Sequence, residues 1–228
     1  MLNLRPMSRE EVRGLDARAA AIGLPTVVLM ENAGRGAAVW LRERLAGPSA
    51  RVAIVCGPGN NGGDGAVAAR HLDAWGYAVR VVWLAAPERL RGDAATQWRI
   101  FDAAGIHQES WTDEPLDPAR LDGLFAAADW VVDALLGTGL TRPVEGPLRV
   151  AIEALNRAGK PVLALDLPSG LDADTGQPLG AAVRATATLT FAAAKQGFSA
   201  PGASAYTGDV SVVDIGLPRK LLEPYRVP

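Results

Sequence analysis

Hydrophobic and polar positions follow an alternating order of elements from residue 51 onward. The short apolar run RVAIVC at 51–56 predicts a buried strand. Further strands are predicted over 77–85, 128–136, 161–168, 184–193 and 208–216, and helices over about 63–75, 92–105 and 146–159. Strands that alternate with helices imply right-handed crossovers. The pattern therefore predicts an α/β fold with a mostly parallel sheet covered on both faces.

Two helices are predicted before the first strand. Ser8 and Glu11 fit the S-x-x-E capping box, so a helix should run from near Arg9 to near Gly23. A second helix is predicted over 26–45, with Gly34 and Gly36 as weak points. No clear helix is predicted between the last two strands. Since no repeat or long linker divides the chain, we expect one domain over residues 1–228.

Composition excludes several classes of protein. The formal net charge of -2 does not suit a nucleic-acid surface, which is normally basic. No apolar run approaches the roughly 18 residues that a membrane span needs, and the first residues contain no apolar signal-peptide region. We expect a cytoplasmic protein that binds neither membrane nor nucleic acid. The single cysteine, Cys56, excludes an internal disulfide and a multi-cysteine metal site.

Polar residues follow the predicted strands at their carboxyl ends. The first strand leads into GPGNNGGDG at 57–65, the third contains Asp133, the fourth ends at Asp166, and the fifth runs toward Lys195. Each ending alone is explained by tight turns and helix caps. In a parallel sheet, however, these ends gather at the crevice where ligands bind. Together they favour a binding site.

The glycine-rich loop resembles a dinucleotide-binding fingerprint. Gly57, Gly59 and Gly62 fit G-x-G-x-x-G, and amides at a helix N-terminus can bind phosphate. An ordinary dehydrogenase also has an acid at the end of the second strand, which holds a ribose hydroxyl. Here Glu88 lies beyond Pro87, too far along the chain. The sequence therefore disfavours a nicotinamide-dependent dehydrogenase.

Asp133 and Asp166 are carboxylates within or beside strongly apolar strands. An unpaired buried carboxylate is costly, so amides, a cation or protonation must compensate. Oxygen ligands of this kind suit a hard cation, and a raised pKa would suit a general acid or base; capping of the following loop is the alternative. Two basic residues also have two interpretations. Arg142 would bind phosphate or pair with Glu145, and Lys195 would reach a phosphate or, slightly favoured, be solvated.

Five segments carry a resemblance to a known family: LMENAG at 29–34, GPGNNGGDG, DALLGTGLTRPVEG, ALDLPSGLDADTG and TFAAAKQG. In this order, over nearly the whole chain, they resemble the YjeF N-terminal domain family, that is, NAD(P)H-hydrate epimerases. The resemblance implies a Rossmann-like three-layer α/β/α sandwich with a mostly parallel central sheet. It also implies a homodimer with one potassium ion (K+) per subunit.

The same resemblance implies a role for individual residues. Potassium ligands would be Asn61, Asp133 and Ser169, helped by backbone carbonyls. Asp166 would lie at the substrate and serve as the catalytic acid and base. The expected substrate contacts are Asn60, Asn61, Gly62, Gly63, Asp64, Gly137, Thr138, Gly139, Leu140, Thr141, Arg142, Pro143 and Asp166.

The implied activity is epimerisation of the R and S forms of hydrated NADH and NADPH at nicotinamide C6. Its functional partner would be an ADP- or ATP-dependent NAD(P)H-hydrate dehydratase that acts on the S form. The alternative is a non-catalytic nucleotide-binding or dimerisation module of the same fold. We favour the enzyme because the loop amides and acids are all present. A preference for NADH or NADPH hydrate, and whether the chain is standalone or part of a bifunctional protein, stay open.

Overall fold

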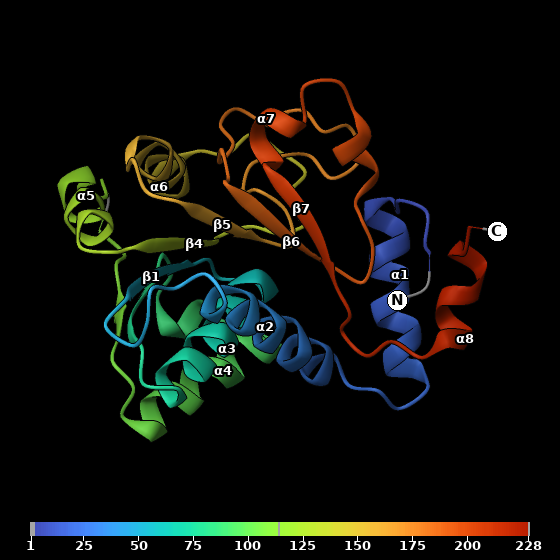
Figure 1. Cartoon of the computed structure of the whole chain (residues 1–228), viewed down its shortest axis with the longest axis horizontal. Helices are drawn as coiled ribbons and strands as arrows, with labels where there is room; N and C mark the ends of the chain where they lie inside the picture. Colours follow the sequence, from blue (N-terminus) through green and yellow to red (C-terminus); the bar gives the residue numbers. More distant parts are fainter. Residues whose placement is uncertain (1–2, 114, 228) are drawn as a thin grey trace.

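A seven-stranded parallel sheet forms the centre of the molecule (Figure 1). The computed structural model describes residues 3–113 and 115–227. The strands lie in the order β3-β2-β1-β4-β5-β6-β7, and each neighbouring pair is parallel. Their bounds are β1 Arg51–Cys56, β2 Ala78–Trp83, β3 Gln108–Ser110, β4 Trp130–Ala134, β5 Val162–Leu165, β6 Ala187–Phe191 and β7 Asp209–Val213.

Helices cover both faces of the sheet and make the predicted three layers. α2 (Thr26–Arg42), α3 (Asn60–Ala74) and α4 (Gly92–Ala104) lie on one face, and α5 (Pro118–Ala126) and α6 (Gly146–Arg157) on the other (Figure 1). Successive residues of β1 point to opposite faces of the sheet. Ile54 packs in the core beneath α2, α3 and α4, and Val55 packs in the core beneath α5 and α6. Both cores consist mainly of small and branched apolar side chains.

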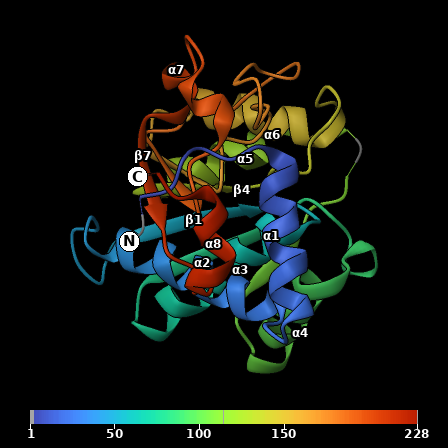
Figure 2. The same ribbon diagram turned by 90° about the vertical axis from the view of Figure 1, so that its right-hand side faces the viewer.

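The chain ends meet beside this sandwich. α1 (Arg9–Ala21) and α8 (Arg219–Leu222) lie side by side (Figure 2), and Arg18 donates a hydrogen bond of 2.8 Å to the Tyr225 hydroxyl. Short helical segments complete the chain: α7 Ser204–Thr207 and the 3-10 turns Pro87–Arg89, Gln196–Ser199 and Glu223–Tyr225. Within the described residues, no helix is long and apolar enough to span a bilayer.

The predicted strands and most predicted helices are confirmed, with three differences. α3 begins at Asn60 rather than near Gly63, because buried packing selects glycine in its first turns despite glycine's low helix propensity. Strand β3 is only three residues long, and α5 starts at a proline preceded by its capping residue Asp117. Both elements were absent from the sequence-based expectation because their apolar patterns are too short.

The sheet reverses its order between β1 and β4, which opens a crevice at their carboxyl ends. The two strand ends are nevertheless in close backbone contact. The Gly57 amide donates to the Ala134 carbonyl at 2.9 Å, and a Cβ at Gly57 would lie 1.8 Å from the Leu135 carbonyl oxygen. A Cβ at Gly62 would lie 2.0 Å from the Gly57 carbonyl oxygen. These glycines therefore allow α3 to start directly against the end of β4.

Gly34 has a packing role that its place in a helix conceals. A Cβ at this position would lie 2.4 Å from Cβ of Val67 and 2.6 Å from the Asp64 carbonyl oxygen, both on α3. Gly36 is similar, since its Cβ would lie 2.4 Å from Cγ1 of Val213. The glycines of α2 are thus the points where α2 approaches α3 and β7 most closely.

We expect Gly34→Ala to lower the free energy of unfolding by about 1–3 kcal/mol, because the added methyl group overlaps α3. Gly14→Ala is the matched control, since the nearest atom to its added Cβ is 3.8 Å away on the Arg18 side chain. That control should stabilise α1 by roughly 0.5–1 kcal/mol through helix propensity. Urea unfolding measures both values; equal changes would contradict the proposed packing.

Candidate active site

A cleft of about 860 Å³ lies at the switch point of the sheet. Its walls are the loops after β1 and β4, the ends of β5 and β6, and parts of α1 and α2. Most residues predicted to contact substrate line it: Asn60, Asn61, Asp64, Asp166 and the loop from Gly137 to Pro143. Gly62 and Gly63 are buried behind this surface, so they shape the backbone rather than the cleft wall.

Helix α3 presents its N-terminus to the cleft. It begins at Asn60, and its N-cap residue, Gly59, offers no side-chain hydrogen bond to the first amides. These amides and the positive end of the helix dipole favour an anion. A phosphate group is therefore suited to this end of the cleft.

Asp133 lies completely buried beneath the cleft. Its carboxylate accepts hydrogen bonds from the Ser169 amide (2.8 Å), the Ser169 hydroxyl (2.6 Å) and the Leu135 amide (3.2 Å). Burial raises the pKa of Asp133 to about 6, although the hydrogen bonds from Ser169 and Leu135 lower it. Amides and a hydroxyl thus supply part of the compensation that the buried carboxylate requires.

Asn61 belongs to the same cluster. Its amide nitrogen donates to the Leu136 carbonyl at 3.0 Å, and that carbonyl oxygen lies 3.2 Å from the Ser169 hydroxyl. The side-chain oxygen Oδ1 of Asn61 is buried, and no hydrogen-bond donor reaches it within the described residues. An unpartnered buried acceptor, linked through the Leu136 carbonyl to the Ser169 hydroxyl that binds Asp133, fits a hard cation.

The donor set favours oxygen coordination. Among the residues that the structure describes, no three His, Cys, Asp or Glu side chains group together as potential metal ligands. Asn61, Asp133 and Ser169 provide amide, carboxylate and hydroxyl oxygens with a single formal negative charge. This chemistry suits a weakly charged hard cation rather than a transition metal.

Asp166 follows β5 and is fixed in an unusual backbone conformation, with φ of 65°. Its amide donates to the Leu189 carbonyl at 2.7 Å. Oδ1 of its carboxylate lies 2.6 Å from Nζ of Lys195 and accepts a weaker hydrogen bond from the Phe191 amide at 3.4 Å. A left-handed conformation at a non-glycine residue is held only where its surroundings determine it, and here it aims an acid at the cleft.

Lys195 is completely buried. Its ammonium also donates to the Thr190 hydroxyl (2.9 Å), the Phe191 carbonyl (3.1 Å) and the Ala193 carbonyl (3.2 Å). The slightly favoured interpretation of Lys195 as a solvated residue was wrong, because a buried charge needs a partner and finds it in Asp166. No local signal marks this pairing, because Asp166 lies 29 residues earlier in the chain. The contact of Lys195 with a phosphate stays a prediction.

The second oxygen of Asp166, Oδ2, lies on the side of Gly137. Oδ2 has no hydrogen-bond partner within the described residues, and a Cβ at Gly137 would lie 3.6 Å from it. The same Cβ would lie 3.6 Å from Cβ of Asn61. Gly137 thus leaves space between the α3 terminus and the carboxylate. One oxygen is anchored and the other is open to a ligand, an arrangement suited to proton transfer.

Two further carboxylates in the cleft have perturbed pKa values. Burial raises the pKa of Asp64 well above its usual range, and the negative charges of Asp166, Asp16 and Asp93 raise it further, against the opposing effect of Lys195. Burial, and then the charge of Asp166, raise the pKa of Asp16 to about 6. Asp16 was not a candidate from sequence, because nothing distinguished it from the solvent-facing charges of α1.

Arg142 is the remaining candidate from the sequence, and neither histidine lines the cleft. Arg142 and Glu145 line the cleft and are exposed, but no ion pair joins them, so this alternative for Arg142 is not formed. His71 contacts Glu31 at 2.8 Å, outside the cleft, and His107 is exposed. The phosphate-binding role of Arg142 stays a prediction.

The doubly wound sheet and the polar cleft at its switch point define a Rossmann-like α/β protein with a cleft where ligands bind in this class of fold. Comparison with known proteins makes this specific: residues 26–197 match the model of the YjeF-related protein N-terminus family. The chain belongs to this family. A crystal structure of yeast ynu0 (YNL200c), 24% identical, shares the fold with a TM-score of 0.80 and covers 97% of this chain and 93% of its own.

Similar curated proteins include enzymes of two lengths. A protein of Rhodopirellula baltica named NAD(P)H-hydrate epimerase is 43% identical, covering all of this chain and 91% of its own. A protein of the same name from Pirellula staleyi is 46% identical over 96% of each chain. A Thermofilum pendens protein named bifunctional NAD(P)H-hydrate repair enzyme Nnr is 46% identical, but the match spans only 41% of its length.

We expect Asp16→Asn to change stability in a pH-dependent manner. Because the folded pKa of about 6 exceeds the usual 3.8, the contribution of Asp16 is present below the usual value and lost as pH rises through 6. The neutral asparagine avoids this loss. Relative to wild type, the variant should gain melting temperature at about pH 7.5 but not at about pH 4.

Differential scanning fluorimetry across this pH range measures the effect. Asp102→Asn, at an exposed position of α4 outside the cleft, is the control and should show no such pH-dependent gain. A gain for Asp16→Asn that is constant at all pH values would contradict the charge-based explanation.

Proposed function

We propose that this protein interconverts the R and S forms of hydrated NADH and NADPH at nicotinamide C6, as an NAD(P)H-hydrate epimerase. The single observation that carries the mechanism is Asp166, whose Oδ1 is anchored by Lys195 while Oδ2 is left open to the cleft. The two epimerase relatives cover nearly the whole chain at 43% and 46% identity, which supports the same activity. The protein is thus an isomerase.

The reaction requires a group that both donates and accepts a proton. In the hydrated cofactor, C6 carries a hydroxyl beside the ring nitrogen, which makes a hemiaminal. Loss of that hydroxyl as water consumes a proton, and addition of water to the other face releases one, so no oxidant or reductant is needed. We assign both transfers to Oδ2 of Asp166, with Lys195 fixing the carboxylate and the φ of 65° fixing its direction.

The cleft walls provide the rest of the substrate site. At about 860 Å³ the cavity is in the size range of small-molecule sites. We assign the diphosphate to the N-terminus of α3 at Asn60 to Asp64, and a further phosphate or ribose contact to Arg142 in the loop from Gly137 to Pro143. Gly62 and Gly63 contribute through the backbone of α3, since they are buried.

We further propose that Asn61, Asp133 and Ser169 hold one potassium ion per subunit. The unpartnered Oδ1 of Asn61 and the buried carboxylate of Asp133 support this assignment. When bound, the ion supplies a fixed positive charge beside the phosphate-binding end of the cleft. The residues themselves join the ends of β1, β4 and β5 through the Leu136 carbonyl and the Asp133–Ser169 hydrogen bonds.

The wider setting follows from the relatives. Several of them are named bifunctional repair enzymes, so we propose that a dehydratase specific for the S hydrate consumes the product. A homodimer, a cytoplasmic location and one domain over residues 1–228 stay predictions. Size-exclusion chromatography with light scattering tests the oligomeric state directly.

Asp166→Asn should slow epimerisation by about 10²–10⁴-fold, because asparagine cannot exchange the proton. The assay supplies R hydrate with an S-specific dehydratase and ATP, and follows the recovery of reduced nicotinamide. Dinucleotide binding is measured in parallel to show that the cleft is intact. Asp122→Asn on α5, where Asp122 pairs with Arg157 and neither residue lines the cleft, is the control and should react as wild type.

Two outcomes would contradict this proposal. Near-normal turnover by a binding-competent Asp166→Asn protein would remove the acid–base role of Asp166. Absence of any acceleration by the wild-type protein, with potassium present, would leave the non-catalytic module as the better interpretation.

Potassium chloride should raise the melting temperature of the wild-type protein more than an equal concentration of choline chloride, because a cation bound to the native state stabilises it. Ser169→Ala should diminish this increment by removing one oxygen ligand. Ser110→Ala is the matched control, since its hydroxyl donates to the Ala85 carbonyl at 2.6 Å away from the site. An equal increment in both variants would exclude Ser169 as a ligand.

A further inference from the structure

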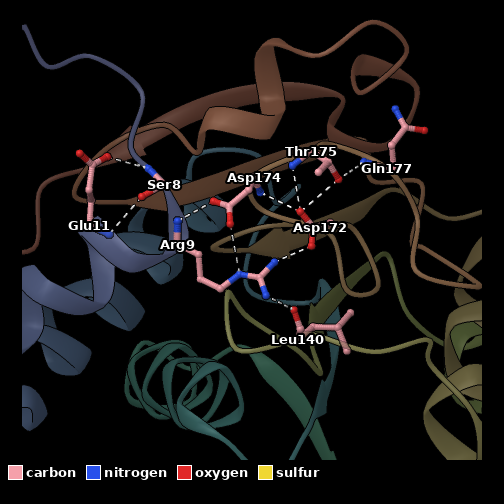
Figure 3. A network of polar contacts seen from close by, with 8 residues as sticks. All are labelled: Ser8, Arg9, Glu11, Leu140, Asp172, Asp174, Thr175 and Gln177. Atoms are coloured by element: carbon pink, nitrogen blue, oxygen red, sulfur yellow. Dashed lines mark hydrogen bonds and ion pairs between the residues drawn. The ribbon is translucent and has the colours of Figure 1, made fainter.

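Arg9, the first residue of α1, joins three segments that are distant in sequence. Its guanidinium donates to the Leu140 carbonyl at 2.6 Å and to the Asp172 carboxylate at 2.5 Å, and its backbone amide donates to Asp174 at 2.7 Å. Figure 3 shows the side chain reaching from the start of the helix between the loops after β4 and β5. The Arg9 side chain is only 14% exposed, so these contacts are partly shielded from water.

The start of α1 does not need the guanidinium. Ser8 caps the helix in a complete capping box with Glu11, and Asp174 binds the Arg9 backbone amide. A change of the Arg9 side chain removes neither cap. The guanidinium therefore serves the two loops rather than the helix on which it stands.

The Asp172 carboxylate, which binds the Arg9 guanidinium, is fixed by hydrogen bonds within its own loop. It accepts hydrogen bonds from the Thr175 amide (2.8 Å), the Thr175 hydroxyl (3.1 Å) and the Asp174 amide (3.0 Å). Burial alone would raise the pKa of Asp172, but the hydrogen bonds from these amides and from Arg9 together lower it. The loop after β5 thus offers Arg9 a rigid anionic anchor.

The other end of the contact is the loop of residues 137–143. Among the described residues, the Arg9 hydrogen bond to Leu140 is the one that reaches this loop from another element. Its internal bond, from the Leu140 amide to the Gly137 carbonyl, is long at 3.4 Å. Thr141, Arg142 and Pro143 are exposed. The loop tip is therefore held by this hydrogen bond from Arg9 and by the packing of the Leu140 side chain against the core beneath it.

α1 is itself a wall of the cleft. Val12, Arg13, Leu15 and Asp16 line the cavity on the same helix that carries Arg9. This helix precedes residues 26–197, the part that the family model matches. The contact from Arg9 thus ties a cleft wall outside that match to the loop expected to bind substrate.

We propose that Arg9 is a positioning residue that holds the loop of residues 137–143 against α1 before substrate binds. Its effect on substrate rests on the proposed epimerase function. With the loop already ordered, the dinucleotide does not have to supply that ordering from its own binding free energy. Arg9 touches no reacting atom; it acts through Leu140.

The kinetic test compares Arg9 with a second arginine of the same region. Arg9→Met should raise KM about tenfold with kcat within about twofold of wild type, because a charge-assisted hydrogen bond to the loop is lost. Arg9→Lys keeps the charge beside Asp172 but not the fork that also reaches Leu140, so it should raise KM while keeping a melting temperature near wild type.

Arg5→Met is the matched control. Arg5 precedes α1 and pairs with Glu11 at 2.6 Å, but it is exposed and does not line the cleft. This variant removes an equal charge near the same helix and should leave KM unchanged. Lower melting temperatures for the Arg9 variants with unchanged KM would reduce Arg9 to a structural salt bridge and overturn the proposal.

Hydrogen exchange without substrate tests the same contact independently of the reaction. Amides of residues 138–142 should exchange faster in Arg9→Met than in wild type, and not in Arg5→Met. If the wild-type protein lacks epimerase activity, the proposed function fails while this measurement still decides whether Arg9 orders the loop. Unchanged exchange in both Arg9 variants would overturn the proposal.

Discussion

The close backbone approach of β1 and β4 at the switch point is the constraint on which the rest of the site depends. The Gly57 amide binds the Ala134 carbonyl, and the position of its absent Cβ would overlap the Leu135 carbonyl. Only with this approach can α3 begin at the strand ends and bring Asn61 into hydrogen-bond contact with Leu136. The cluster of Asn61, Asp133 and Ser169 and the N-terminus of α3 thus follow from one glycine-dependent contact rather than from separate local motifs.

Charge in the cleft is organised around the Lys195–Asp166 contact. A completely buried ammonium would be strongly unfavourable alone, and here it has one carboxylate and three neutral acceptors. The same lysine opposes the upward pKa shifts of Asp16 and Asp64, which burial and neighbouring carboxylates cause. One buried cation therefore limits the mutual repulsion of several acids around the cleft.

The sequence alone could locate residues whose type is unusual at their place on a strand. Asp133 and Asp166 were found because carboxylates are rare beside apolar strands, and parallel topology placed their strand ends at one edge of the sheet. The interpretation of Lys195 failed because its partner lies 29 residues earlier in the chain, and no local pattern announces a long-range ion pair. Gly34 and Gly36 were misjudged similarly: within α2 they weaken a helix, but against α3 and β7 they permit close packing. The helix α5 and strand β3 were too short for hydrophobic periodicity to reveal them.

The contribution of α1 to the cleft could not be predicted from local sequence patterns either. Its capping box was visible as four adjacent residues, whereas Asp16 and Arg9 gain their importance from groups more than 130 residues away. A cleft formed only by strand-end loops would be open on the side where α1 stands. With α1 held by Asp172 and Asp174 on one loop and by Leu140 on the other, the two loops and the helix form one connected wall. In such a wall the central sheet fixes Asp166, while the peripheral helix α1 sets the position of the loop of residues 137–143. Under the proposed function, the acid and the loop that fits the dinucleotide are thus positioned by different parts of the fold.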